Sequence, residues 1–456
     1  MTRSIALNKF YMNNTIKKSI NKERIMTVVR CKELWLECAL AVLLFWFYSY
    51  KLDQSIMPIL LDDEYGYWAN SSYFMGLDWS SITGNIAYYS YGYSLILLVL
   101  RILAPWFDIG SWDGMYQLAT AFNLLMLVAG FFIAVKLCRR YMKNMNWIVR
   151  CVACFVVMLY PANKIYSHIT LSECALTFFF WVFLYMMHRV TDKPSIQNHA
   201  AFALVSVYMY TIHQRTLAQF ITAIIIVVLI RLRRISRLKH TAAFGAVMCV
   251  CLVIHSVIKQ NLQNTLYMGK PPAGFAELVS YACTKKTVLL VLMMLVLLLL
   301  LYLAGRGKVR IAFLLVLAGA AAVGVYIMGR LGAGNTASEV LPDRLAMNDF
   351  AGQWGKVRNI FTVPGLIRLA TSIVGKWFYL AAGSGLVICW GMRNLIINAF
   401  WVTADCLRRM FCALLGKKDD GLKRLHGDSA RHLWFFGVFL AWAGTFMICA
   451  IYKEGL

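Results

Sequence analysis

Long apolar segments alternate with short clusters of basic residues along most of the chain. The plainest apolar segment, 289–303, contains aliphatic residues, methionines and one tyrosine. About 20 such residues are needed to span the hydrocarbon core of a bilayer. Backbone polar groups at that depth must be satisfied within their own segment, which makes each span a helix. The pattern therefore predicts an all-α polytopic membrane protein.

Eleven crossings follow when the basic clusters are kept on the cytoplasmic side, as the positive-inside rule requires. The expected spans lie near residues 34–50, 116–137, 147–162, 171–188, 199–212, 217–230, 241–258, 287–304, 311–329, 366–391 and 432–452. The first 32 residues carry eight Lys or Arg, so we expect the N-terminus in the cytoplasm and the C-terminus outside. No small-residue cleavage site follows the first span, so we interpret it as an uncleaved helix rather than a signal peptide.

The apolar segment 88–104 is left out of this count. As a crossing, it would put Asp108 and Asp113 in a cytoplasmic loop without basic residues, and the basic turn at Arg139 and Arg140 outside. Both anomalies disappear if the segment is a juxtamembrane or re-entrant helix that returns to the outer side. We therefore expect one long exterior loop at 51–115 that bears juxtamembrane helices.

Residues 199–230 are apolar except for the polar centre His213, Gln214 and Arg215. The basic cluster that follows, between Arg231 and Lys239, should be cytoplasmic. Two short helices, 199–212 and 217–230, satisfy that requirement, whereas a single span would not. They place His213 and Arg215 at an outer turn.

One membrane domain accounts for the chain. We expect a basic cytoplasmic N-terminus at 1–33, a transmembrane domain at 34–392, a basic cytoplasmic loop at 393–431 and a last transmembrane helix within 432–456. The cytoplasmic loop begins with a segment at 394–414 that resembles an interfacial helix, because charged residues are scattered among its apolar ones.

The composition excludes an ordinary soluble domain. The 456 residues are 60% hydrophobic and only 15% charged, and the net charge is +25. The basic residues lie mostly between apolar runs, where they set orientation and meet anionic lipid, so we expect the lipid bilayer and no nucleic acid as a partner. The cysteines lie mostly inside apolar runs, where they act as small hydrophobic residues. Cys151 and Cys154 therefore favour packing over a zinc site.

Scarce carboxylates mark the candidate chemistry. Asp62, Asp63 and Glu64 open a predicted helix in the exterior loop, where a carboxylate drawn into apolar surroundings could act as a general base. Stabilisation of the first helical turn explains them equally well. Glu173, at the outer end of the fourth span, is open to the same two interpretations, functional acid or helix cap.

Two cations complete the set. Arg215 lies at the tip of the short helical pair, where it could bind a lipid phosphate or simply extend to the membrane surface. Lys376 lies inside the tenth span, where an ammonium group needs an anion. Carboxylates and cations on one face suit a reaction between a neutral hydroxyl group and a phosphate-bearing lipid.

The ordered motifs resemble the GT-C superfamily of integral membrane glycosyltransferases, in particular protein mannosyltransferases and the aminoarabinose-lipid A transferase, of glycosyltransferase family 39 type. The resemblance covers about the first 230 residues and rests on four motifs. They are Asp63-Glu64-x-x-Tyr67, the Tyr-rich segment 88–95, Leu171-Ser172-Glu173 and His213-Gln214-Arg215.

The resemblance implies a GT-C-like bundle and transfer of a sugar from a polyprenyl-phosphate donor to an acceptor hydroxyl at the outer face. The acceptor would belong to a lipid, a protein or a polysaccharide. Asp63, or its neighbour Asp62, would be the general base of an inverting reaction. Arg215, with His213 and with Lys376 as a second choice, would bind the donor phosphate.

The remaining acids and their neighbours would serve the acceptor. Glu64 and Glu173 would bind it or orient the base, with His168 and Tyr67 beside them. Some relatives use a divalent metal with paired acids, and no second acid cluster here identifies one, so the sequence names no cofactor and leaves a metal open.

Departures from the family pattern leave alternatives. Glu173 stands where several relatives have Asp, a common Pro-Pro pair is missing, and the C-terminal half shows no recognisable acceptor domain. A transporter or flippase for lipid-linked saccharides is one alternative, although the chain lacks the related halves typical of transporters. A polysaccharide polymerase or ligase is another, supported by the basic residues of segment 330–365. The family resemblance favours a bacterial plasma membrane.

Overall fold

The computed structural model describes residues 32–52, 62–84, 88, 90–142, 145–232, 235–283, 288, 292, 295–296, 299, 302, 433–442 and 444–445. Every regular element within this part of the chain is a helix, which confirms the all-α class. Four helices in it are long and apolar enough to cross a membrane: Trp112–Tyr141, Glu173–Asp192, Gln214–Arg231 and Leu238–Tyr267. The protein is therefore a helical membrane protein, and the total of eleven crossings stays a prediction.

Several predicted segments lie outside the described residues. They are the spans at 311–329 and 366–391, the interfacial segment at 394–414, Lys376 and the basic segment 330–365. The spans at 287–304 and 432–452 are described only in part, the latter as a helix over 433–442. The division into four regions therefore remains untested.

Helix α5 (Trp112–Tyr141) is the longest described helix, with 30 residues. Its start is explained by Ser111, whose side chain accepts a hydrogen bond from the backbone N–H of Gly114. Asp113 lies in the first turn and two arginines in the last, as the helix dipole favours. The helix therefore extends beyond the predicted range of 116–137 at both ends.

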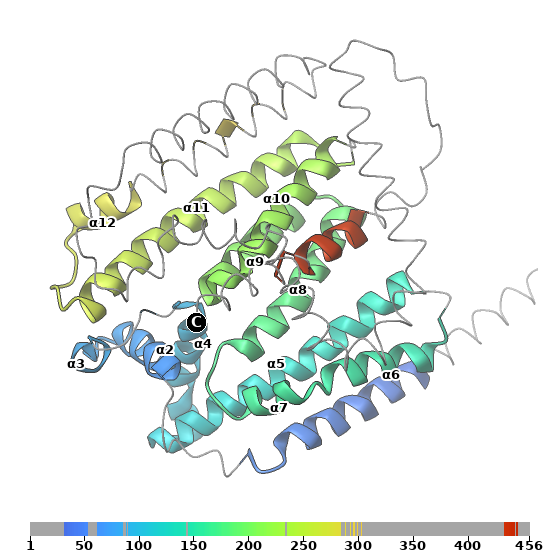
Figure 1. Cartoon of the computed structure of the whole chain (residues 1–456), viewed down its shortest axis with the longest axis horizontal. Coiled ribbons are helices and arrows are strands. Elements are labelled where there is room, and N and C mark those ends of the chain that lie inside the picture. Colours follow the sequence, from blue (N-terminus) through green and yellow to red (C-terminus); the bar gives the residue numbers. More distant parts are fainter. Residues whose placement is uncertain are drawn as a thin grey trace, which may run out of the picture.

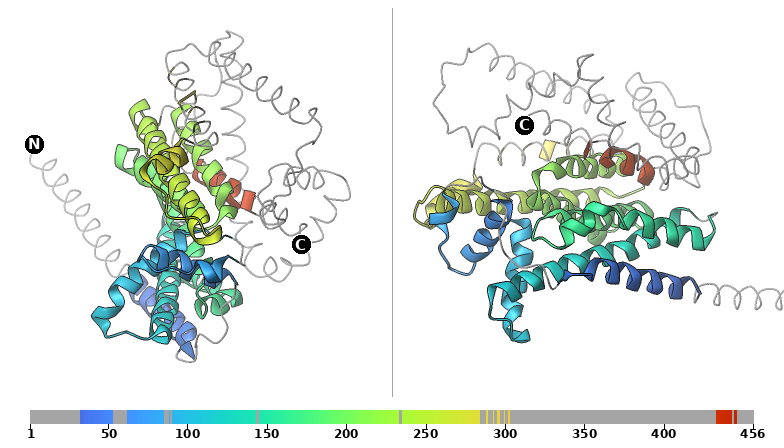
Figure 2. Two further views of the ribbon diagram at one scale, coloured as in Figure 1. Left: turned by 90° about the vertical axis from the view of Figure 1, so that its left-hand side faces the viewer. Right: turned by 60° about the horizontal axis from the view of Figure 1, so that its bottom comes forward.

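The predicted span at 147–162 is divided into two helices. Helix α6 (Trp147–Met158) ends before Tyr160, whose backbone is extended, and α7 (Pro161–Ser167) begins with a proline. Proline disfavours the helical conformation of the preceding residue, which explains the break between the two helices. Figures 1 and 2 show the helix over 32–49 running beside α6.

The helical pair predicted at 199–230 is present. Helix α9 (Ile196–Ile212) and helix α10 (Leu217–Leu232) are separated by His213, whose backbone is extended, and by the 3-10 helix η3 (Gln214–Thr216). Helix α9 packs between α8 (Glu173–Asp192) and α11 (Leu238–Leu262). The polar centre therefore forms a turn at one end of the bundle.

Three short helices from the long loop gather at this same end (Figures 1 and 2). They are α2 (Asp62–Tyr73), α3 (Ser80–Thr83) and α4 (Gly92–Leu103), which continues into the 3-10 helix η2 (Ala104–Phe107). At 1.5 Å per residue the 12 residues of α4 extend about 18 Å, well short of a bilayer core of about 30 Å. This length fits the juxtamembrane helix predicted at 88–104.

Close packing of α4 against α9 depends on Gly92. A Cβ atom at this position would lie 2.5 Å from backbone atoms of Thr211 and Ile212. The hydroxyl group of Tyr208 also donates a hydrogen bond to the Gly92 carbonyl oxygen, at 3.0 Å. The loop helices are thereby fixed against the end of α9. Beyond α11, a π-helical turn η4 (Gln263–Tyr267) precedes α12 (Phe275–Ala282).

The bundle has two chemically different ends. We call the end that bears α2, α3 and α4 the loop end; α5 and α8 begin there and α9 ends there. We call the other end the basic end, because α5, α8 and α10 finish there with basic last turns. Two buried hydrophobic clusters fill the interior between these ends.

Candidate functional site

Three elements bring charged residues together at the loop end. Asp63 lies in the first turn of α2, Glu173 is the first residue of α8, and Arg215 lies in η3. Asp63 and Arg215 both interact electrostatically with the Glu173 carboxyl group. Three separate motifs of the sequence therefore meet in one site.

The three side chains differ in exposure. Arg215 is exposed and Asp63 is partly exposed, so both can be reached from outside the bundle. The Oε2 atom of Glu173 is buried and accepts no hydrogen bond from any described residue. A buried carboxylate oxygen without a donor is costly, because the water that it lost has not been replaced. Such an atom is suited to accept a hydrogen bond from a bound hydroxyl group.

Glu64 has a different environment from Asp63, its neighbour. Its side chain is buried, and Oε1 accepts three hydrogen bonds. The donors are the Tyr116 hydroxyl at 2.9 Å, the Thr170 backbone N–H at 2.7 Å and the Thr170 hydroxyl at 2.6 Å. Glu64 therefore joins α2 to α5 and to the segment before α8, which is a positioning role.

Two further α2 side chains contact that same segment. The Tyr67 hydroxyl donates to Ser172 Oγ at 3.1 Å, and Trp68 Nε1 donates to Thr170 Oγ1 at 3.0 Å. Both aromatic rings are buried. These bonds hold the first turn of α2 beside the start of α8, which keeps Asp63 next to Glu173.

His168 and Lys164 bind the end of the first helix. His168 Nε2 lies 2.9 Å from the Tyr48 carbonyl oxygen, and burial lowers the pKa of this histidine. Lys164 Nζ donates to the carbonyl oxygens of Phe47, Tyr48 and Tyr50, at 2.8 to 2.9 Å. A lysine at this position satisfies carbonyl groups that a helix leaves open at its C-terminus.

His213 positions the segment that carries Arg215. Its Nδ1 atom accepts a hydrogen bond from the Arg215 backbone N–H at 3.1 Å. Burial and the nearby Arg215 charge lower the pKa of His213 to about 4. The ring is therefore neutral at pH 7, with its proton on Nε2.

Tyr166 also belongs to this site, although we did not predict it from the sequence. Its phenol is half-buried in α7 and interacts electrostatically with both Glu173 and Arg215. Burial, followed by the Glu173 charge, raises the pKa of Tyr166. The only sequence signal was its place seven residues before Glu173, which is weak because a helix and a turn lie between them.

The two other predicted residues are less informative. Asp62 begins α2, directly before Asp63, so the choice of base between them stays open. Lys376 lies outside the described residues.

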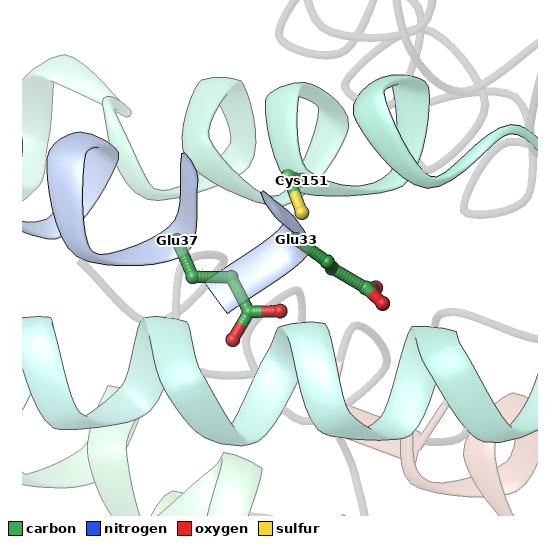
Figure 3. A group of neighbouring side chains, drawn as sticks. All are labelled: Glu33, Glu37 and Cys151. Atoms are coloured by element: carbon green, nitrogen blue, oxygen red, sulfur yellow. The ribbon is translucent and has the colours of Figure 1, made fainter. Parts of the chain in front are cut away.

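A group with metal-ligand chemistry lies elsewhere, towards the basic end. Figure 3 shows Glu33 and Glu37 of the first helix beside Cys151 of α6, all three buried. Arg139 forms ion pairs with both carboxylates, and Arg150 binds Glu33 at 3.2 Å. These guanidinium groups already balance the carboxylates, so we interpret the group as an ion-pair network.

The loop-end site can therefore supply a reachable carboxylate, a buried carboxylate oxygen, a phenol and an exposed guanidinium group. This arrangement can bind an anion and remove a proton from a hydroxyl group. The chain matches no family model, no curated protein and no solved structure with which it was compared.

Proposed function

We propose that the protein is an inverting membrane glycosyltransferase that uses a polyprenyl-phosphate sugar as donor. The observation that carries this proposal is the meeting of Asp63, Glu173 and Arg215 at the loop end. These residues come from three motifs of the GT-C resemblance, and their charges act on one another at the loop end. The acceptor would be a hydroxyl group of a lipid, protein or polysaccharide.

Each side chain has a role in this reaction. Asp63, or its neighbour Asp62, accepts the proton of the acceptor hydroxyl as the hydroxyl oxygen attacks the anomeric carbon, and the bond from that carbon to the lipid phosphate breaks. Arg215 binds the phosphate and stabilises its charge as it leaves. Glu173 accepts a hydrogen bond from the acceptor, and Glu64 and Tyr67 hold α2 in place.

The same proposal sets the orientation. The loop end faces the exterior and the basic end faces the cytoplasm, as the basic last turns of α5, α8 and α10 favour. The donor would reach Arg215 from the outer leaflet of a bacterial plasma membrane, with the N-terminus in the cytoplasm.

Sugar transfer from a radiolabelled polyprenyl-phosphate hexose tests this function. The protein is purified in detergent, and sugar release or transfer is measured for the wild type, Asp63→Asn and Asp62→Asn. We expect one substitution to reduce the rate about 10²- to 10⁴-fold, the usual contribution of a general base. Asp113→Asn is the matched control, because Asp113 is exposed in the first turn of α5 at the same end.

Donor binding supplies the second readout. Arg215→Gln should weaken binding of the polyprenyl-phosphate sugar, and Arg215→Lys should restore part of it, because lysine keeps the charge but not the bidentate geometry. Donor binding that occurs without any turnover, and that neither Asp62→Asn nor Asp63→Asn changes, would contradict the proposed enzymatic activity. It would indicate a carrier of lipid-linked saccharides instead.

A further inference from the structure

A cavity of about 460 Å³ lies between the C-terminal turns of α5 and α8, at the basic end. Its charged lining comes from Lys136, Arg139, Arg140, Arg189, Lys193 and Asp192. Among the described residues, five cations and one carboxylate line the cavity, so its lining is positive. The loop-end site uses none of these residues.

The helical periodicity explains why the basic residues converge. Lys136, Arg139 and Arg140 are spaced three and four residues apart, so they share one face of α5. His188, Arg189 and Asp192 follow the same spacing on α8. The two faces pack against each other, and a direct ion pair of 2.5 Å joins Arg140 to Asp192.

The cations are only partly neutralised by the protein. Arg139 is paired with Glu33 and Glu37, and Arg140 with Asp192. Lys136 lies over the Tyr185 ring at 4.7 Å, a contact that leaves its charge in place. Arg189 and Lys193 form no ion pair with any described residue. The cavity therefore has positive charge available for an anion.

The position of the cavity indicates the kind of anion. Its residues occupy the last two turns of two candidate membrane spans, where the apolar helix surface ends and lipid headgroups lie. Basic pockets between transmembrane helices on the cytoplasmic side suit anionic lipid headgroups. Arginine guanidinium groups also match phosphate geometry.

We propose that this cavity binds the phosphate of an anionic phospholipid headgroup, with Arg189 and Lys193 as its principal contacts. The site is independent of the glycosyltransferase reaction, because it lies at the other end of α5 and α8. A bound headgroup would bridge the two helices and stabilise their packing.

Lipid titration tests the proposal on the delipidated full-length protein in detergent. Phosphatidylglycerol, phosphatidylcholine and inorganic phosphate are added separately, and binding is measured by native mass spectrometry and by the shift in Tm. We expect saturable binding and an increase in Tm with phosphatidylglycerol, and neither with phosphatidylcholine. Phosphate stabilisation without any lipid effect would overturn the lipid headgroup in favour of a soluble phosphate compound.

Charge-matched variants locate the site. The double variant Arg189→Gln/Lys193→Gln should weaken phosphatidylglycerol binding about 30-fold, since each basic side chain near anionic lipid contributes about a factor of five. The control Arg237→Gln/Lys239→Gln removes the same charge from exposed positions near the start of α11, outside the cavity. Equal weakening by both double variants would overturn the site and indicate general attraction to basic protein.

A variant that should bind the lipid more tightly separates loss of the site from loss of folding, because a misfolded protein would not gain affinity. Asp192→Asn removes the one carboxylate that lines the cavity among the described residues and frees Arg140, so it should tighten phosphatidylglycerol binding about fivefold. Weaker binding by Asp192→Asn, in a protein whose Tm without lipid is unchanged, would contradict the proposal.

Discussion

Buried carboxylates have opposite surroundings at the two ends of the bundle. At the basic end, Glu33 is held between Arg139 at 3.1 Å and Arg150 at 3.2 Å. At the loop end, Glu173 Oε2 is buried without a hydrogen-bond donor from the described residues. Glu64, also at the loop end, lies between these extremes, because three neutral donors satisfy its Oε1 atom.

This difference separates acids that support the fold from acids that are available for chemistry. Removing one partner of a buried ion pair is costly, because the other charge is left uncompensated. A buried carboxylate oxygen that lacks a donor, such as Glu173 Oε2, already carries such a cost in the folded protein. Natural proteins commonly retain a destabilised group where function requires it. The same Glu→Gln change should therefore have a different effect at each of the three positions.

The largest effect is expected at the basic end, for Glu33→Gln. The substitution leaves Arg150, whose side chain is nearly buried, without its ion pair. The free energy of unfolding should fall by about 3 kcal/mol, the lower end of the usual cost, since the Glu37 carboxylate still attracts this arginine. Denaturant titration in detergent measures this free energy of unfolding. The double variant Glu33→Gln/Arg150→Met should recover part of the loss, and an unchanged stability of Glu33→Gln would show that the network contributes nothing.

Glu64→Gln should lower the free energy of unfolding by a smaller amount, about 1 to 2 kcal/mol. The amide oxygen can still accept hydrogen bonds from Tyr116 and Thr170, but bonds to a charged acceptor are about twice as strong as neutral ones. The same denaturant titration measures the change. Stability equal to that of the wild type would contradict a contribution of these hydrogen bonds to the stability of the fold.

Glu173→Gln should raise the free energy of unfolding by about 1 kcal/mol while it lowers sugar transfer. The substitution removes a partly buried charge and its repulsion with Asp63, which together outweigh the attraction to Arg215 that is lost with them. Stability and transfer are measured on the same preparation. A fall in stability of the size expected for Glu33→Gln would place Glu173 among the structural acids and remove the contrast between the two ends.

At neutral pH the smallest effect is expected at His213 of the loop end, because its contribution appears only as the pH falls. The pKa of His213 is lowered to about 4 in the folded protein from an ordinary value of 6.5. The folded state therefore binds fewer protons than the unfolded state within this window, so the free energy of unfolding falls as the pH falls from 6.5 towards 4. His213→Gln should reduce that fall relative to the wild type in Tm measured across pH 4 to 7. Identical pH profiles would contradict a buried neutral His213.

Much of the helical layout could be predicted, because it follows from local physical chemistry. The two short helices around His213 were predicted from the basic cluster after residue 230, and the structure contains both. The predicted extent of the helix at 147–162 was wrong. We based it on apolar composition and did not take account of Pro161, which begins a new helix. The candidate site was predicted as a set of motifs, but not as a set of contacts.

The sequence by itself determined the membrane class, the helices and the separation of basic from acidic ends, because hydropathy and charge act residue by residue. Only the tertiary structure decided which acid does what. Adjacent residues Asp63 and Glu64 have the same kind of side chain, yet α2 turns Glu64 into the bundle towards Tyr116 and Thr170 and leaves Asp63 partly exposed. The physical reason is that burial and hydrogen-bond partners depend on segments far apart in the chain, whose approach is set by packing.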